Sequence, residues 1–206
     1  MTPSRQDTRF RTGIRSVSAT VCPRCGAAVD ADAKWCPSCN FTGGDSVAMF
    51  PDPPPPLLPL LDAAGIWNTG DVRRIETARE KLRRRFPQFH FHVCTVMLPE
   101  ETSLPVFGFW LLNVCPFYVS ETAEDRAWTV LLLINAKTGK SAVIPGYSAE
   151  NWLTDDDWTK VLSLMAALWK SGKSADAVIR YFENSATFLD HVWKQRGLRR
   201  SKKSRS

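Results

Sequence analysis

The stretch "WTVLLLINAKTGKSAVI", residues 128–144, decides the fold. It opens with a continuous apolar run, Trp128 to Ile134, and an uninterrupted run of this length is typical of a strand that is covered on both faces of its sheet. The turn sequence "NAKTG" follows, and Lys140 to Ile144 returns as a second strand. The pattern predicts two neighbouring strands in a sheet that is buried from both sides.

The segments on either side alternate between helical and strand patterns. Residues 89–98 are rich in aromatic and β-branched side chains and predict a strand, whereas residues 104–117 are apolar and predict a buried helix that ends before Pro116. Apolar residues recur at helical spacing in three further ranges, 69–86, 158–169 and 178–192. The order helix, strand, helix, strand, strand, helix, helix predicts an α/β fold, a layered α/β/α sandwich with a central, mostly parallel sheet.

The charge is distributed unevenly along the 206 residues, whose formal net charge is +6. Residues 1–21 hold four Arg and one Asp, residues 194–206 hold seven Lys or Arg and no acid, and the part between them is slightly acidic. The 44% of hydrophobic residues indicates a folded core. No transmembrane segment and no secretory signal are recognisable, so we expect a cytoplasmic protein.

Composition also predicts where the chain divides. The run Pro53 to Pro56 favours an extended spacer that holds two folded parts apart. The expected parts are a disordered basic N-terminus at 1–20, a cysteine module at 21–42, a Pro-rich linker at 43–59, the α/β domain at 60–193 and a basic disordered tail at 194–206.

The cysteine module carries the strongest motif. Cys22 and Cys25 form one CxxC pair, Cys36 and Cys39 form another, and ten residues separate the pairs. Each pair can wrap a tight turn around one metal, so the spacing favours a structural Zn²⁺ over redox dithiols or disulfides. Gly26 and, at the second pair, Asn40 stand where such a turn favours positive φ.

The motif "CPRCG … WCPSCN" resembles the short zinc-ribbon family, with Trp35 at its aromatic position and Asn40 in place of the final glycine. A site closed by four thiolates stabilises a fold and does not catalyse. Between the pairs, Lys34 is the one basic residue and is opposed by Asp30 and Asp32, which argues against a nucleic-acid surface on the ribbon itself.

Residues 60–193 resemble the TPM domain family, whose members include thylakoid-lumen, photosystem-repair and receptor-modulating proteins. The resemblance rests on short motifs in a characteristic order: Asp62 and Gly65, then Val130 to Leu133, then Gly146, Tyr147 and Glu150, then Leu153 to Asp155, and finally Lys173 to Ala177.

This resemblance implies a fold and two kinds of function. Some family members are described as acid phosphatases, some bind a divalent cation, and others bind partners of membrane complexes. Asp62, Glu150 and Asp155 are the acidic positions that match, so they are the candidates for a Ca²⁺ or Mg²⁺ site. The chain departs from the family in Ser148-Ala149, in Ser174, and in the absence of a recognisable signal peptide or anchor.

Three aspartates in a row, Asp155 to Asp157, raise the question of a metal or catalytic cluster. Thr154 precedes them, and Thr-x-x-Asp at this spacing nearly matches a capping box, so the favoured interpretation is a helix start. The alternating His90, His92 and Cys94 could offer metal ligands on one strand face, but half-buried strand positions are the more frequent reason for such a pattern.

Three functions remain open at this point. The first is a zinc-binding, TPM-like binding or scaffold protein with a protein partner. The second is a divalent-metal-dependent phosphatase. The third is nucleic-acid binding through the ribbon and the basic tail, for which an anionic membrane surface is the other polyanionic partner.

Overall fold

Four strands form the central sheet of the computed structural model, which describes residues 19–30, 33–50, 54–117 and 122–203. The strand order is β3-β4-β5-β6, and only the β5–β6 pair is antiparallel. These strands are β3 (Leu60–Asp62), β4 (His90–Val96), β5 (Thr129–Asn135) and β6 (Ser141–Pro145). The predicted α/β class with a mostly parallel sheet is confirmed.

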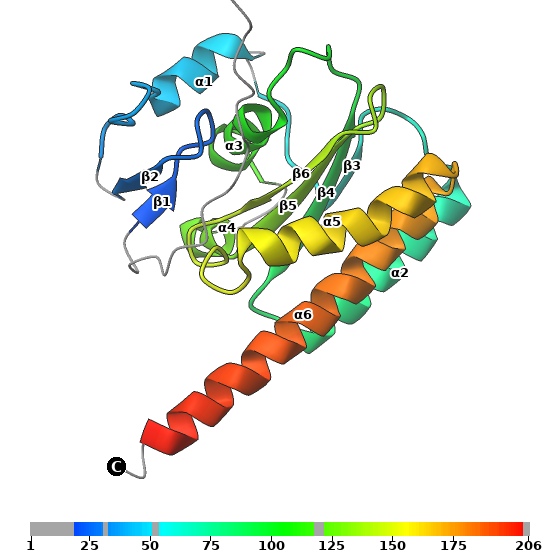
Figure 1. The fold of residues 1–206 in the computed structure, drawn as a ribbon. Helices are drawn as coiled ribbons and strands as arrows, with labels where there is room; N and C mark the ends of the chain where they lie inside the picture. The colour runs from blue at the N-terminus through cyan, green and yellow to red at the C-terminus, as the bar shows by residue number, and fades with distance from the viewer. Residues whose placement is uncertain (1–18, 31–32, 51–53, 118–121, 204–206) are drawn as a thin grey trace, which may run out of the picture.

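Helices cover both faces of this sheet (Figure 1). On one face lie α2 (Thr69–Arg85), α5 (Asp155–Lys170) and α6 (Ser174–Lys203), and on the other lie α3 (Leu104–Val114) and, outside it, α1 (Gly43–Met49); a short α4 (Ala123–Ala127) precedes β5. Because β3, β4 and β5 are parallel neighbours in chain order while α2 and α3 cover opposite faces, one of the two crossovers must be left-handed, against the usual preference.

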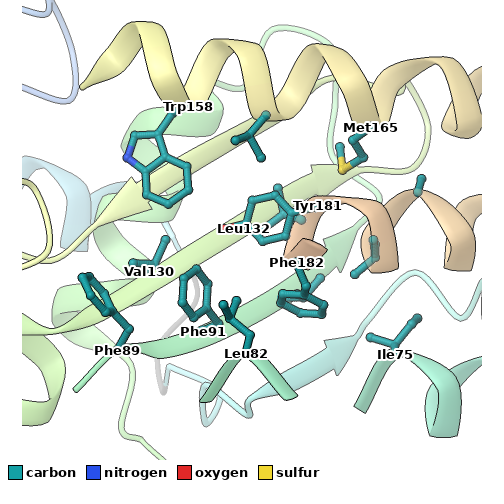
Figure 2. Close-up of a cluster of buried hydrophobic side chains, with 14 of the residues drawn as sticks. Ile75, Leu82, Phe89, Phe91, Val130, Leu132, Trp158, Met165, Tyr181 and Phe182 are labelled. Atoms are coloured by element: carbon teal, nitrogen blue, oxygen red, sulfur yellow. The ribbon is translucent and has the colours of Figure 1, made fainter. Parts of the chain in front are cut away.

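The larger core lies between the sheet and the α2, α5 and α6 layer, as Figure 2 shows. Every residue of β5 is buried, with Val130 and Leu132 facing this layer and Leu131 and Leu133 facing α3. Alternate residues of β4 divide in the same way, so Phe91 packs with Tyr181 and Phe182 of α6. The continuous apolar run of the sequence therefore reflects a strand that is covered twice.

The three aspartates start a helix, as the sequence favoured. Thr154 accepts a hydrogen bond from the backbone N–H of Asp157, and the Asp157 carboxylate accepts one from the backbone N–H of Thr154, which completes a capping box at α5. At α2 the cap is Asn68, whose side-chain oxygen accepts a hydrogen bond from the backbone N–H of Asp71.

The range expected to be an extended linker contains ordered, packed structure. Helix α1 begins inside it with a capping box at Thr42, and the Phe50 ring packs 4.9 Å from the ring of Phe107 and 5.1 Å from that of Trp110. Leu57 is fully buried and forms an isolated parallel bridge with Phe117. The spacer interpretation is therefore wrong for these residues, because the partly buried Phe50 and the buried Leu57, on either side of the proline run, pack in the same cluster as α3.

The beginning of the tail also differs from the prediction, since α6 continues as a helix to Lys203. Residues 1–18, 51–53 and 204–206, on which the other predictions of disorder or of a spacer fall, lie outside the described residues. In the part of the chain that the structure describes, no helix has the length and apolarity needed to cross a membrane.

Replacing Gly146 tests the turn that follows β6. A Cβ at this position would lie 2.4 Å from the carbonyl oxygen of Arg126 and 2.6 Å from that of Ala127, and both are backbone atoms that cannot rotate away. We expect Gly146→Ala to lower the free energy of unfolding by about 2 kcal/mol or more, measured by urea denaturation. Gly43→Ala is the control, because no atom lies within 4 Å of its added Cβ; an equal loss in both variants would contradict the steric argument.

Candidate metal centre

The four cysteines of the ribbon are held by two turns with the same backbone hydrogen bonds. At the first turn, the N–H of Gly26 donates to the carbonyl of Cys22, and the N–H of Cys22 donates to the carbonyl of Ala27. At the second turn, Asn40 donates to Cys36 and Cys36 donates to Phe41 in the same manner. Gly26 and Asn40 have φ values of 73° and 57°, as predicted for their positions.

The two turns bring the sulfur atoms of Cys22, Cys25, Cys36 and Cys39 within 4.8 Å of one another. The Cys22 and Cys39 Sγ atoms are 3.7 Å apart, and those of Cys25 and Cys36 are 3.6 Å apart. A tetrahedral site with a Zn–S distance of about 2.3 Å requires sulfur atoms about 3.8 Å apart, whereas a disulfide requires about 2.05 Å. The cluster therefore fits a metal ion such as zinc.

The electrostatics of the cluster also favour a bound cation. Burial raises the pKa of the Cys22 thiol to about 12. At Cys36 burial acts in the same direction, but hydrogen bonds from the backbone N–H groups of Ser38 and Cys39, together with those from the neighbouring cysteine side chains, outweigh it and lower the pKa to about 7. Four thiolates this close together repel one another, so a bound dication is what would hold all of them deprotonated.

The ribbon is docked on the α/β domain. Its strands β1 (Ala19–Val21) and β2 (Ala28–Asp30) form an antiparallel hairpin, and Cys22, Cys36 and Phe41 form a small buried cluster with Val106 of α3. The rings of Phe41 and Phe109 meet edge to face at 6.0 Å. The sequence alone did not identify Val106 and Phe109 as contacts of the metal module. Both lie in a helix that is apolar around most of its circumference, and this was a signal that a second layer covers the helix.

The three carboxylates matched by the TPM resemblance do not converge. Among the described residues, the four cysteines are the only group of three or more side chains placed to hold a metal. Asp62 lies at the carboxyl end of β3, where its carboxylate accepts hydrogen bonds from the backbone N–H of Trp67, at 2.9 Å, and from the Thr95 hydroxyl. The first contact closes the loop that leads from β3 into α2, and the second joins β3 to the neighbouring β4.

Glu150 and Asp155 lie at the opposite end of the sheet. The register pairs Asp62 with Thr95 and Thr95 with Ile134, near the end of β5, whereas the turn that carries Glu150 begins at Gly146, which bonds to Thr129 at the start of β5. Five residues of strand separate Thr129 from Ile134, or about 16 Å. A site that combines Asp62 with Glu150 and Asp155 is therefore not formed.

The other residues considered as candidate ligands or binding residues make contacts that belong to the fold. His90 lies 3.4 Å from the Asp125 carboxylate, the His92 ring packs on Phe117, and Cys94 is buried in the core beneath α3. Burial raises the pKa of Cys94 to about 12, and that of Cys115 to about 11, as expected for core thiols. Arg83, Arg84 and Arg85 lie exposed on α2, where the first two contact Glu80.

No family model matches the chain, and no curated protein matches it. Among solved structures, it is similar to the N-terminal domain of a protein from P. gingivalis, with a TM-score of 0.50 and 16% identity over 64% of this chain and 82% of that one. It is also similar to the N-terminal domain of the cg2496 protein from Corynebacterium glutamicum, with a TM-score of 0.49 and 11% identity over 63% of this chain and 78% of that one. The first likeness supports the α/β arrangement and concerns the fold alone.

Loss of one ligand tests the metal centre. We expect the purified chain to carry about one zinc ion, as measured by elemental analysis, and Cys36→Ser to lose it, because three thiolates and a hydroxyl bind zinc far more weakly. Cys115→Ala is the control, since it removes a buried thiol outside the cluster. Retention of zinc by Cys36→Ser, or equal loss in the control, would contradict the assignment.

Replacement of Asp62 separates a structural role from a metal-binding role. We expect Asp62→Ala to lower the free energy of unfolding by about 1–3 kcal/mol, because the Trp67 N–H and the Thr95 hydroxyl lose their acceptor. Asp156→Asn, an exposed change in the same series of candidate acids, is expected to have little effect. Added Ca²⁺ or Mg²⁺ that raised the melting temperature of the native chain, but not that of Asp62→Ala, would instead indicate a cation site at Asp62.

Proposed function

We propose that this chain is a zinc-dependent binding protein in which a TPM-like α/β domain and a zinc ribbon together form a protein-interaction scaffold. One observation carries the proposal: the ligand cluster of the described residues is a closed four-cysteine centre, and it displays a large apolar side chain, Trp35, to solvent. A closed centre of this kind orders a surface and offers no open position for a substrate.

Trp35 supports a protein partner in particular. It lies directly before Cys36, so it is fixed by one of the two metal-binding turns, and 57% of its surface is exposed. The inner side of the ribbon is already buried on α3 through Phe41, which leaves the outer side available. A rigid, exposed tryptophan is the residue type that most often dominates the binding energy of a protein interface.

The TPM-like part of the proposal rests on the order of the motifs and on what their residues do in the fold. Gly146 leaves no room for a side chain beside the carbonyl groups of Arg126 and Ala127, and Asp62 closes the loop before α2. These are fold-forming roles. A phosphatase of the same family type would need its carboxylates to converge on a cation, and the separation of Asp62 from Glu150 and Asp155 gives that alternative no support.

A reducing compartment such as the cytoplasm fits this proposal. The four cysteines of the ribbon must remain thiolates to bind zinc, and Cys94 and Cys115 are free thiols as well. In an oxidising compartment the two CxxC pairs would be exposed to disulfide formation, which would compete with metal binding.

Substitution of Trp35 tests the partner surface. We expect Trp35→Ser to abolish the specific recovery of partner proteins when the tagged full chain is used for affinity capture, while zinc content and melting temperature stay unchanged. Leu164→Ser is the matched control, because Leu164 is a similarly exposed large apolar residue on α5. Recovery of the same proteins by both variants would contradict the ribbon surface, and metal-dependent hydrolysis of para-nitrophenyl phosphate that is lost in Asp62→Asn would favour the enzyme instead.

A further inference from the structure

The positive charge of the chain is concentrated on two helices that lie side by side. Helix α2 carries seven Lys or Arg and three acids, and α6 carries the same numbers. Together the two helices have an excess of eight positive charges; over the length that they share, Thr69–Arg85 and residues 174–190, they hold eight Lys or Arg and six acids, and the other six cations lie in residues 191–203. Nothing in the sequence indicates that segments a hundred residues apart form one basic layer.

Two ion pairs between the helices fix their alignment. Arg74 of α2 contacts Asp176 near the start of α6, and Arg85, at the end of α2, contacts Asp190. The two helices therefore run in the same direction over the whole length of α2, which is about 26 Å. Beyond Asp190, α6 extends past the end of α2 to Lys203, and residues 191–203 contain six Lys or Arg and no acid (Figure 1).

An open groove with a volume of about 610 Å³ lies between the two helices. Its α2 side carries Arg73, Arg74, Lys81 and Arg85, whereas Glu183 is the only acid that lines it among the described residues. The rest of the lining consists of small or apolar side chains, namely Thr77, Ala78, Leu82, Ile179, Phe182, Ala186 and Thr187. A groove between two helices with cations along its rim favours an extended anionic ligand over a compact apolar one.

The acids nearby neutralise this rim only in part. Asp176 and Asp190 engage Arg74 and Arg85 at the two ends of the groove, and Glu183 contacts Arg180. Within the described ranges, Arg73 and Lys81 have no ion-pair partner, and both are exposed. The groove therefore keeps at least two uncompensated cations that face solvent.

An aromatic pair involves Trp193 of α6, which follows Thr187, the last residue of α6 that lines the groove. The ring of Trp193 stacks on Trp152 with a centroid distance of 5.2 Å and an angle of 18° between the ring planes, and the guanidinium of Arg196 lies 4.2 Å from the Trp152 centroid. Trp193 is nevertheless 52% exposed, and Lys194 follows it. An exposed, rigidly held indole among cations is a stacking platform of the kind that binds nucleobases.

We propose that the α2/α6 layer binds a nucleic acid strand, whose phosphates follow the cationic groove toward the end of α6 and whose bases stack on Trp193. A polyanion suits a basic band of this length better than an acidic peptide segment, because phosphates supply a negative charge at every step along it. An anionic membrane fits less well, because the band is hollowed and carries few exposed apolar side chains. The binding is independent of the ribbon surface proposed above, which lies on the other face of the sheet.

The test is the affinity of the full zinc-loaded chain for a fluorescently labelled oligouridylate, for the matching oligodeoxythymidylate and for duplex DNA, measured by fluorescence anisotropy between about 50 and 200 mM salt. We expect Arg73→Gln combined with Lys81→Gln to weaken binding about tenfold or more at the lower salt concentration and to reduce the slope of log affinity against log salt by about one to two. We also expect Trp193→Ala to weaken binding of the single strands about fivefold or more, with little effect on the duplex.

The control is Lys34→Gln combined with Lys137→Gln, which removes the same charge from two exposed lysines outside the layer. This variant is expected to bind within about twofold of the native chain, and circular dichroism is used to verify that every variant is folded. Equal weakening in the control, or no binding by the native chain, would overturn the proposal. The proposal would also be overturned if the native chain bound polyglutamate or phosphatidylserine vesicles and the Arg73 and Lys81 variant lost that binding to the same extent as it lost nucleic acid binding. The layer would then recognise negative charge of any origin.

Discussion

Helix α3 is the constraint on which the rest of the structure depends, because it is apolar around most of its circumference, with Asn113 as its one polar residue, and both of its apolar sides must be covered. Its buried residues are Leu104, Val106, Phe107, Gly108, Trp110, Leu111 and Leu112. The sheet covers one side, where Gly108 lies so close to Ile144 that an added Cβ would meet that side chain at 2.3 Å. The ribbon and α1 cover the other side. The metal module therefore contributes to the burial of α3 and is not an independent domain on a flexible linker.

This arrangement explains why a small module needs a metal. A module that consists of a hairpin of two three-residue strands and two turns buries too little apolar surface to stay folded by itself, so the four-cysteine centre supplies the missing stability. Once ordered, the module contributes Phe41 to the cover of α3, and the adjoining α1 is followed by Phe50, which packs on Trp110. Metal binding and the burial of α3 therefore reinforce each other, while the outer side of the ribbon stays free to carry Trp35.

The sequence was sufficient wherever a local pattern determines the result. The buried strand at residues 129–135, the capping box at Thr154 and the two cysteine turns follow from spacing and residue type alone. It failed where the outcome depends on contacts distant in sequence. The proline-rich range looked like a spacer because its apolar residues, Phe50 and Leu57, have no local partner, and only the position of α3 shows what they bury. Asp62 and Glu150 lie at opposite ends of the sheet because of the strand order, which the order of the motifs along the chain does not reveal.

The same reasoning separates the roles of charge in the two halves of the molecule. The acids that the motifs select are occupied locally: Asp62 closes a loop, and Asp157 caps a helix. The cations of α2 and α6 are in excess of their partners, even though Asp176 and Asp190 bridge the two helices. Exposed ion pairs of this kind contribute about 1 kcal/mol or less to stability, so fold stability alone does not require fourteen cations on two helices. The excess of positive charge lies on α2 and on residues 191–203 of α6, and a concentration of charge of this kind raises the association rate of anionic ligands with that side of the molecule.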